Sequence, residues 1–198
     1  MWDKRYDEEG FAYGTQPNDF LTSQYTQIKK GGKVLCLAEG EGRNAVFLAK
    51  QGYQVTAVDQ SGVGLEKASN LAKQQGVSIK TVVADLLDYD FAINTWDGIV
   101  SISAHMPAPL RQKIHEQVIP ALANDGVFIL EAYTPKQLEM NGVGGPPNKA
   151  LLMSLDELKV ELKGLDFEIG QEIERHISEG KYHQGQSAVV QVLARKNS

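Results

Sequence analysis

The sequence has little of what marks a secreted, membrane-spanning or nucleic-acid-binding protein. Its 198 residues include one cysteine, Cys36, so no internal disulfide can form, and a reducing cytosol fits this usage. The formal net charge of −5 provides no basic surface for nucleic acid or anionic membranes. No apolar run approaches the roughly 20 residues that span a bilayer, and residues 3–9 are too charged for a secretory signal. We therefore expect a cytoplasmic protein without nucleic-acid or membrane partners.

What the sequence does have is an alternation of strand and helix patterns over a length that suits one domain. The hydrophobic content of 42% is enough for a substantial core. Cap residues and apolar spacing predict helices at residues 18–29, 44–50, 65–72 and 107–118, with another after Ser154. This alternation is typical of a parallel sheet that is covered on both faces.

A glycine turn between the first strand and the next helix is the most informative local feature. The apolar run 34–37 leads into Gly40 and Gly42, where the missing Cβ lets backbone amides approach a ligand. The second strand, residues 53–58, ends at Asp59, whose carboxylate can accept from both hydroxyls of a ribose. The pattern predicts a nucleotide-type cofactor site.

Later strands continue this arrangement and then change character. Residues 79–83 lead to Asp85, and residues 96–103 form an acidic-start fourth strand. The runs 166–173 and 187–194 are separated by a polar loop and no helix, which predicts an antiparallel pair.

This series resembles the class I S-adenosylmethionine (SAM)-dependent methyltransferases over nearly the whole chain. The opening segments 2–6 and 11–21, with the stretches 102–107 and 128–135, are similar to the tellurite-resistance and thiopurine methyltransferase group. The resemblance implies a single domain over residues 1–198, in which residues 1–30 form an N-terminal lid and helix. The implied fold is α/β: a Rossmann-like, seven-stranded, mostly parallel sheet with helices on both faces and a C-terminal antiparallel hairpin.

The resemblance also implies which residues hold SAM, or S-adenosylhomocysteine as the product. These residues are Glu39, Gly40, Gly42, Arg43, Asp59, Gln60, Asp85, Leu86 and Ser101. Most family members carry an acid where this chain has Cys36, and we expect Glu39 to pair with the cofactor's ammonium group instead. The alternatives are a solvated loop residue for Glu39, a turn residue for Asp59 and a cap for Asp85.

The acceptor side is expected where the fourth, fifth and sixth strands end. The candidate residues are Tyr13, Tyr133, Arg175, His176, Tyr182 and His183. His105 follows the fourth strand, and the ordinary histidine pKa near 6.5 suits a general base; a plain helix-start histidine is the alternative. The histidine spacing is not that of a zinc site, so we expect no metal. The glycine- and proline-rich segment 142–147 is either a lid or a connector.

We expect the chain to transfer a methyl group from SAM to a small-molecule acceptor. A soft thiol, selenium or tellurium nucleophile needs no base, whereas a small neutral oxygen or nitrogen nucleophile does. One alternative is a SAM-binding sensor or partner-binding module without robust catalysis. A weaker one is an NAD-dependent oxidoreductase, because Gly40-x-Gly42-x-x-Ala45 also satisfies the dinucleotide fingerprint. We infer no obligatory protein partner.

Overall fold

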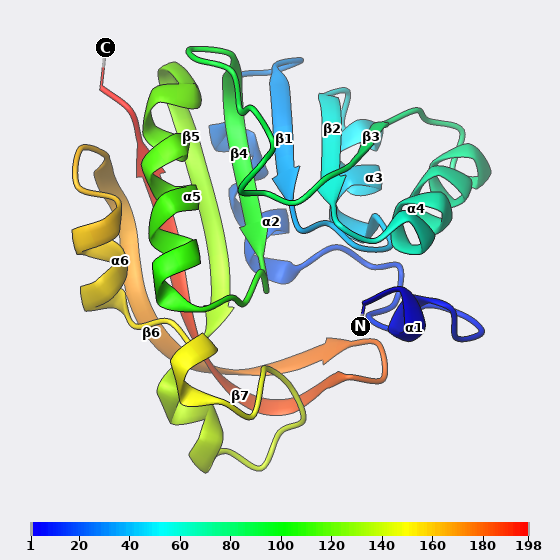
Figure 1. Cartoon of the computed structure of the whole chain (residues 1–198), viewed down its shortest axis with the longest axis vertical. Helices are drawn as coiled ribbons and strands as arrows, with labels where there is room; N and C mark the ends of the chain where they lie inside the picture. Colours follow the sequence, from blue (N-terminus) through cyan, green and yellow to red (C-terminus); the bar gives the residue numbers. More distant parts are fainter. Residues whose placement is uncertain (1, 198) are drawn as a thin grey trace.

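The computed structural model describes residues 2–197, which build one seven-stranded sheet in the order β3-β2-β1-β4-β5-β7-β6 (Figure 1). The strands are β1 (Lys33–Leu37), β2 (Gln54–Asp59), β3 (Lys80–Val83), β4 (Trp96–Ile102), β5 (Leu122–Tyr133), β6 (Asp166–Glu179) and β7 (His183–Arg195). The first five strands are parallel, and β7 is antiparallel to both β5 and β6. The expected fold class is therefore confirmed, and β6 runs in the same direction as the first five strands.

Helices cover both faces of this sheet. They are α1 (Trp2–Tyr6), α2 (Asp19–Gln24), α3 (Arg43–Lys50), α4 (Gly62–Gln74), α5 (Ala108–Ala121) and α6 (Leu155–Glu161), with 3-10 turns η1 (Tyr25–Gln27), η2 (Pro135–Glu139) and η3 (Lys149–Leu151). Because successive strand residues face opposite sides, Val34 and Cys36 pack with α2 and α3, whereas Leu35 and Leu37 pack in the cluster that contains α5 and α6. Helix α1 lies apart, beyond the carboxyl ends of the strands and near α4 (Figure 1).

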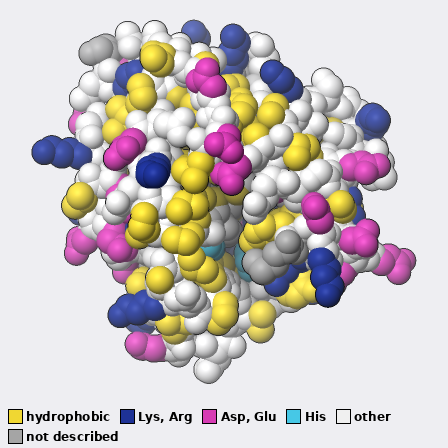
Figure 2. Space-filling model, in the orientation of Figure 1, with side chains coloured by type: hydrophobic (Ala, Val, Ile, Leu, Met, Phe, Trp, Pro, Cys, Tyr) yellow, Lys and Arg dark blue, Asp and Glu magenta, His cyan; other side chains and the backbone are white. Residues whose placement is uncertain are grey.

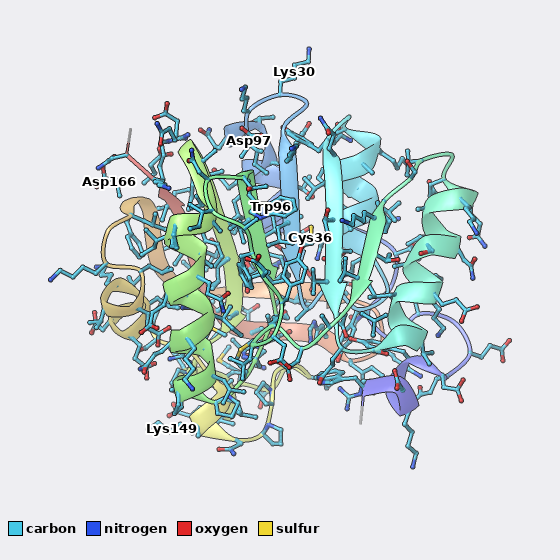
Figure 3. The ribbon with its side chains drawn as sticks, turned by 45° about the horizontal axis from the view of Figure 1, so that its top comes forward. Lys30, Cys36, Trp96, Asp97, Lys149 and Asp166 are labelled. Carbon is cyan, nitrogen blue, oxygen red and sulfur yellow. The ribbon has the colours of Figure 1, made fainter. Side chains whose placement is uncertain are left out.

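The amino and carboxyl ends of the parallel strands form two opposite edges of the sheet, called here the amino edge and the carboxyl edge, and they carry different residues. At the amino edge, the Oδ2 atom of Asp97 accepts from the backbone N–H of Lys33 at 2.9 Å, which ties β4 to the start of β1. Figure 3 shows Asp97 and Lys30 toward this end of the strands, Cys36 within the sheet and Lys149 at the opposite end. The glycine turn and the strand-ending polar residues all lie at the carboxyl edge.

The first predicted helix is shorter than expected. Asn18 caps it as predicted, because its side-chain oxygen accepts from the N–H of Leu21 at 3.0 Å. Regular α-helix ends at Gln24, however, and η1 follows instead of a continuation to residue 29. The hydroxyl of Tyr53 contacts the carbonyl oxygens of Tyr25 and Ile28, and this tertiary contact accompanies the tighter turn.

The C-terminal hairpin is longer than the two runs that the sequence indicated. Its strands continue to Glu179 and restart at His183, so only residues 180–182 form the turn. The polar stretch 174–179 was expected to be loop. It is strand because Arg175 and Glu179 satisfy each other and neighbouring groups in ion pairs, which side-chain polarity alone does not reveal.

Candidate cofactor and acceptor site

The turn between β1 and α3 is closed by two glycines with left-handed backbone. Gly40 has a φ of +61° and Gly42 a φ of +87°. A Cβ on Gly42 would lie 2.5 Å from the Cβ of Ala68 in α4, so the turn and α4 approach too closely for any side chain there. The N–H of Gly40 donates to Asp59 Oδ2 at 2.9 Å, which joins the turn to the end of β2.

Asp59 lies at the centre of this arrangement and is only 5% exposed. Its Oδ1 atom accepts from the N–H of Ser61 at 2.8 Å, and the Ser61 hydroxyl in turn caps α4. Burial raises the pKa of Asp59, although the amides of Ser61 and Gly40 oppose that rise. Backbone groups hold the carboxylate, and no cation within residues 2–197 pairs with it, so it can take hydroxyl donors on its remaining lone pairs.

Glu39 has a structural partner that the sequence interpretation missed. Its Oε1 atom accepts from the N–H groups of Asn44 at 3.0 Å and Ala45 at 2.7 Å, in the first turn of α3. Gly42 occupies the N-cap position and has no side chain to do this. Burial raises the pKa of Glu39 to about 7, against the lowering effect of these amides. The expected ammonium contact stays a prediction.

The other expected cofactor residues end neighbouring strands. Ser101 is 4% exposed in β4, and Leu86 packs into the core after β3. Asp85 is exposed, and its Oδ1 accepts from the N–H of Leu87 at 2.9 Å, so it does form the local turn that was its alternative role. Gln60 is exposed beside Asp59.

The N-terminal segment covers the glycine turn. Tyr6 of α1 is 5% exposed, and its ring packs so closely that a Cβ on Gly40 would lie 2.6 Å from the Tyr6 hydroxyl oxygen. A Cβ on Gly64 of α4 would likewise contact the Tyr6 ring at 2.9 Å. Burial, followed by the nearby Asp59, raises the pKa of the Tyr6 hydroxyl. Sequence reasoning did not single out Tyr6, although it lies in the aromatic opening segment that suggested a lid.

We call residues 2–14 the N-terminal strap, because they connect the glycine turn to the tip of the hairpin. The N–H of Ala12 donates to Glu41 Oε2 at 2.8 Å, and the carbonyl of Ala12 accepts from the N–H of Lys181 at 3.2 Å. Glu8 forms an ion pair with Lys181 and accepts from the Tyr182 hydroxyl at 2.9 Å. The strap therefore closes one side of the region between the sheet and the hairpin.

Four of the expected acceptor residues come together where the strap meets the hairpin. The ring centroid of Tyr13 lies 4.5 Å from that of His183 and 6.0 Å from that of Tyr182. His183 also lies 5.1 Å from the ring of Tyr133, so it is placed between two tyrosines. Burial lowers the pKa of His183, with Glu179 acting in the opposite direction.

The two arginines expected at the site are bound to glutamates. Arg43 donates to Glu179 Oε2 at 2.8 Å instead of presenting a free cation to a cofactor carboxylate. Arg175 contacts both oxygens of Glu131, at 2.6 and 3.1 Å. The Asn18 amide bridges Glu131 and Glu179, at 2.8 and 2.9 Å. Each guanidinium thus already has a buried carboxylate partner, and the expected direct roles of Arg43 and Arg175 stay predictions.

His176 is not part of this group. It is exposed in β6, whereas its neighbours Arg175 and Ile177 lie on the opposite face of the strand. Because residues 174–179 were interpreted as a loop, the alternation of faces along a strand was not applied to them. Applied there, it would have placed His176 on the opposite face from Arg175.

His105 does not have the free lone pair that a general base requires. One ring nitrogen, Nδ1, lies 3.0 Å from the carbonyl oxygen of Leu151, which requires Nδ1 to carry the proton. The other, Nε2, then accepts from the backbone N–H of Tyr133 at 3.3 Å. Burial lowers the pKa of His105 to about 4, so the ring is neutral. The alternative of a structural helix-start histidine fits this geometry better than the base.

The face that contains these groups is hollowed. Figure 2 shows a depression near the centre of the molecule, with histidine atoms visible inside it, and comparison with Figure 1 places it between the ends of the strands and the hairpin. Within residues 2–197, no group of three or more His, Cys, Asp or Glu side chains is arranged to hold a metal ion. No helix in that same range is long and apolar enough to cross a bilayer.

Comparisons with known proteins agree with this architecture. Residues 34–126 match the profile of a methyltransferase domain family. Sterol 24-C-methyltransferase ERG6A of Gibberella zeae is 31% identical over 123 residues, which cover 61% of this chain and 32% of that protein. The chain thus spans about a third of the length of this relative.

Two solved structures show the same fold. One, from work on the conversion of a disulfide bond into a thioacetal group during echinomycin biosynthesis, has a TM-score of 0.77 and 18% identity, covering 98% of this chain and 88% of that one. TehB from Haemophilus influenzae has a TM-score of 0.72 and 22% identity, covering 90% and 62% respectively. The matching domain, the sheet order and the glycine turn joined to Asp59 together support a class I SAM-dependent methyltransferase.

Proposed function

We propose that the protein transfers the methyl group of SAM to a small-molecule acceptor bound between the carboxyl edge of the sheet and the hairpin. The observation that carries this proposal is the glycine turn after β1, whose Gly40 amide is bonded to the Asp59 carboxylate at the end of β2. We propose a cytosolic location, with which the single buried thiol of Cys36 is consistent.

The residues present fit SAM. Asp59 ends β2 with a carboxylate that no cation within residues 2–197 pairs with, which suits the two ribose hydroxyls. The Gly40–Gly42 turn, which the Tyr6 ring covers, would adjoin the methionine portion. In the proposed assignment Glu39 binds the ammonium group, Asp85, Leu86 and Gln60 surround adenine, and Ser101 lies beside the cofactor. SAM supplies a methyl group that its sulfonium already activates.

The protein's own part is then to position the acceptor and exclude water. Oriented pairs reach effective molarities of about 10⁵ M or more, so positioning alone accounts for much of the rate. The Tyr13, Tyr133 and His183 side chains would enclose the acceptor, and the strap would cover it. Because both ring nitrogens of His105 are engaged, we favour an acceptor that is already ionised and soft, such as a thiolate or a selenium or tellurium oxyanion.

Ligand binding tests the cofactor assignment. SAM or S-adenosylhomocysteine at about 100 times its Kd should stabilise the fold by roughly 2.7 kcal/mol, and NAD should not. Asp59→Ala should weaken SAM at least tenfold, because hydrogen bonds to a charged group contribute about 1.5–3 kcal/mol each.

The matched control is Asp97→Ala, which also removes a carboxylate bound to a backbone amide but at the opposite edge. Its Kd for SAM should stay within about twofold of the wild-type value. Stabilisation by NAD alone would overturn the cofactor assignment. Turnover is then measured with thiols, selenite, tellurite, phenols and amines; SAM binding without turnover on any of them would favour a sensor.

A further inference from the structure

The hydroxyl of Tyr133 is the one buried side-chain polar atom within residues 2–197 that has no hydrogen-bond partner. Tyr133 ends β5 at the carboxyl edge of the sheet and is 1% exposed. Buried polar atoms are usually paired, since an unsatisfied one retains the full penalty of leaving water. The polar groups near it already have other partners: Glu131 pairs with Arg175, Glu179 pairs with Arg43, and His105 contacts the backbone of Leu151. An unpaired hydroxyl in such surroundings indicates a missing ligand.

A cover of glycine backbone lies directly on this hydroxyl. We use "cover" for residues 142–147, which lie between η2 and η3 and contain three glycines and two prolines. A Cβ on Gly144 would lie 2.3 Å from the Tyr133 hydroxyl oxygen, and one on Gly145 would lie 2.9 Å from the ring. No other residue type could approach this closely. The bridge between Val143 and Gln184 attaches the cover to the hairpin, and Gly142 packs against the backbone of Gln186 beside it.

The Tyr133 hydroxyl can donate a hydrogen bond to an incoming group, or accept a weak hydrogen bond from it. Burial, with further contributions from Glu179 and Glu131, raises the pKa of Tyr133, so the group keeps its proton at neutral pH. Its neighbours are the neutral rings of His105 and His183, with centroids 5.7 and 5.1 Å from its own. The hydroxyl of Tyr133 thus lies among neutral aromatic rings and has a proton to donate.

We propose that the Tyr133 hydroxyl donates a hydrogen bond to the methyl acceptor and thereby selects acceptors with an oxygen or thiolate sulfur at that point. The cover moves aside to admit the acceptor and closes on it afterwards. This inference rests on the proposed function, because it places the acceptor at the carboxyl edge beside SAM.

Tyr133→Phe tests the proposal, because it removes the hydroxyl and keeps the ring. Two probes distinguish the acceptor chemistries: thiophenol, which presents a thiolate, and selenite, which presents oxygens. Binding of each to the complex with S-adenosylhomocysteine is measured by calorimetry, and turnover with SAM is measured in parallel. The variant should bind the preferred probe at least tenfold more weakly and lose at least tenfold in kcat/KM. Its Kd for SAM should stay within twofold, and its Tm should equal or exceed that of the wild type.

Tyr53→Phe is the matched control, because the Tyr53 hydroxyl is satisfied by two backbone carbonyls at 3.0 and 3.2 Å and lies away from the hollow. It should melt lower than the wild type and keep kcat/KM within twofold. The opposite signs of the two Tm changes separate a ligand-binding hydroxyl from a structural one.

Three outcomes would overturn the inference. They are an unchanged probe Kd and kcat/KM in Tyr133→Phe, a Tm that falls as it does in Tyr53→Phe, and failure of both probes to bind the wild-type complex. Failure of the wild type to bind SAM is a distinguishable result, since it contradicts the proposed function itself.

Discussion

The single carboxylate of Glu39 is assigned two roles, one in capping α3 and one in binding the cofactor. Its Oε1 atom already holds the first turn of α3 through the amides of Asn44 and Ala45, while the proposed site assigns the same side chain to the cofactor's ammonium group. The two roles are compatible, because a carboxylate has about four lone-pair positions over its two oxygens. They differ in their dependence on charge, since a neutral amide oxygen can cap a helix but pairs poorly with a cation.

Glu39→Gln should therefore stabilise the free protein at high pH and weaken SAM. The folded-state pKa of about 7 lies above the ordinary value, so the folded protein holds this proton more firmly than the unfolded chain does. That stabilisation is complete below the ordinary carboxyl pKa and is lost as pH rises through about 7. The amide avoids the loss, so the variant's advantage in unfolding free energy should grow by about 1–3 kcal/mol between pH 5 and pH 8.

Urea unfolding across this pH range measures the first effect, and calorimetry with SAM and adenosine measures the second. Adenosine lacks the ammonium group, so its affinity should stay nearly unchanged. Equal losses for both ligands, or an advantage that does not depend on pH, would contradict these roles for Glu39.

At the scale of elements, the N-terminal strap and the hairpin tip depend on close backbone contact. A Cβ on Gly180 would lie 2.4 Å from the carbonyl carbon of Tyr13 and 2.5 Å from the carbonyl oxygen of Ala12. Both are backbone atoms that cannot rotate away. The glycine thus allows the strap to reach the hairpin while its own φ of +66° forms the turn.

Gly180→Ala should loosen the strap, and Gly76→Ala provides a matched control. Gly76 has a similar φ of +71°, but a Cβ there meets open space. Both variants should lose about 1 kcal/mol of stability through left-handed backbone strain. Only Gly180→Ala should speed tryptic cleavage after Lys4 and Arg5 and weaken SAM several-fold, because the strap carries Tyr6 over the glycine turn. Equal cleavage rates in the two variants would show that the contact does not hold the strap.

At the scale of the whole molecule, one buried network ties distant parts of the chain together. Asn18, Arg43 of α3, Glu131 of β5 and Glu179 of β6 meet at the carboxyl edge through the ion pairs and amide bonds described above. Burial alone would raise the pKa of Glu179, but the His183 hydrogen bond and the Arg43 guanidinium hold it well below the ordinary range. Ionised Glu179 therefore contributes to folding stability.

Glu179→Gln should cost about 3 kcal/mol at pH 7, because it leaves Arg43 buried without its counter-charge. Since the folded-state pKa is depressed, the contribution is present above the ordinary carboxyl pKa near 4.5 and is lost as pH falls below it. The gap between the wild type and the variant should therefore narrow in acid. Glu168→Gln, which breaks the more exposed pair with Arg195, should cost less than about 1 kcal/mol. Urea unfolding measures both variants. An equal loss of unfolding free energy in the two would show that the buried network stabilises the fold no more than an exposed ion pair does.

The sequence by itself determined the fold class and the edge of the sheet at which a cofactor site is expected. Apolar periodicity, the glycine turn and the acids that follow each strand are local signals, and parallel strands must bring their carboxyl ends to one edge. The caps at Asn18 and Ser154 were equally readable, because an N-cap bond spans only three residues.

Only the tertiary structure decided which polar side chains are available at that edge. Arg43 and Glu179 are far apart in the sequence, and so are His105 and the Leu151 carbonyl, so no local pattern records that each pair is joined. The length of the hairpin could not be predicted for the same reason. The charged residues within 174–179 indicate a loop unless their buried partners are known. Contacts across the fold occupy the Nε2 lone pair of His105 and leave the Tyr133 hydroxyl without a partner. The reason is that a buried polar group has no water to bond with, so the distant groups that fold against it decide whether it is paired.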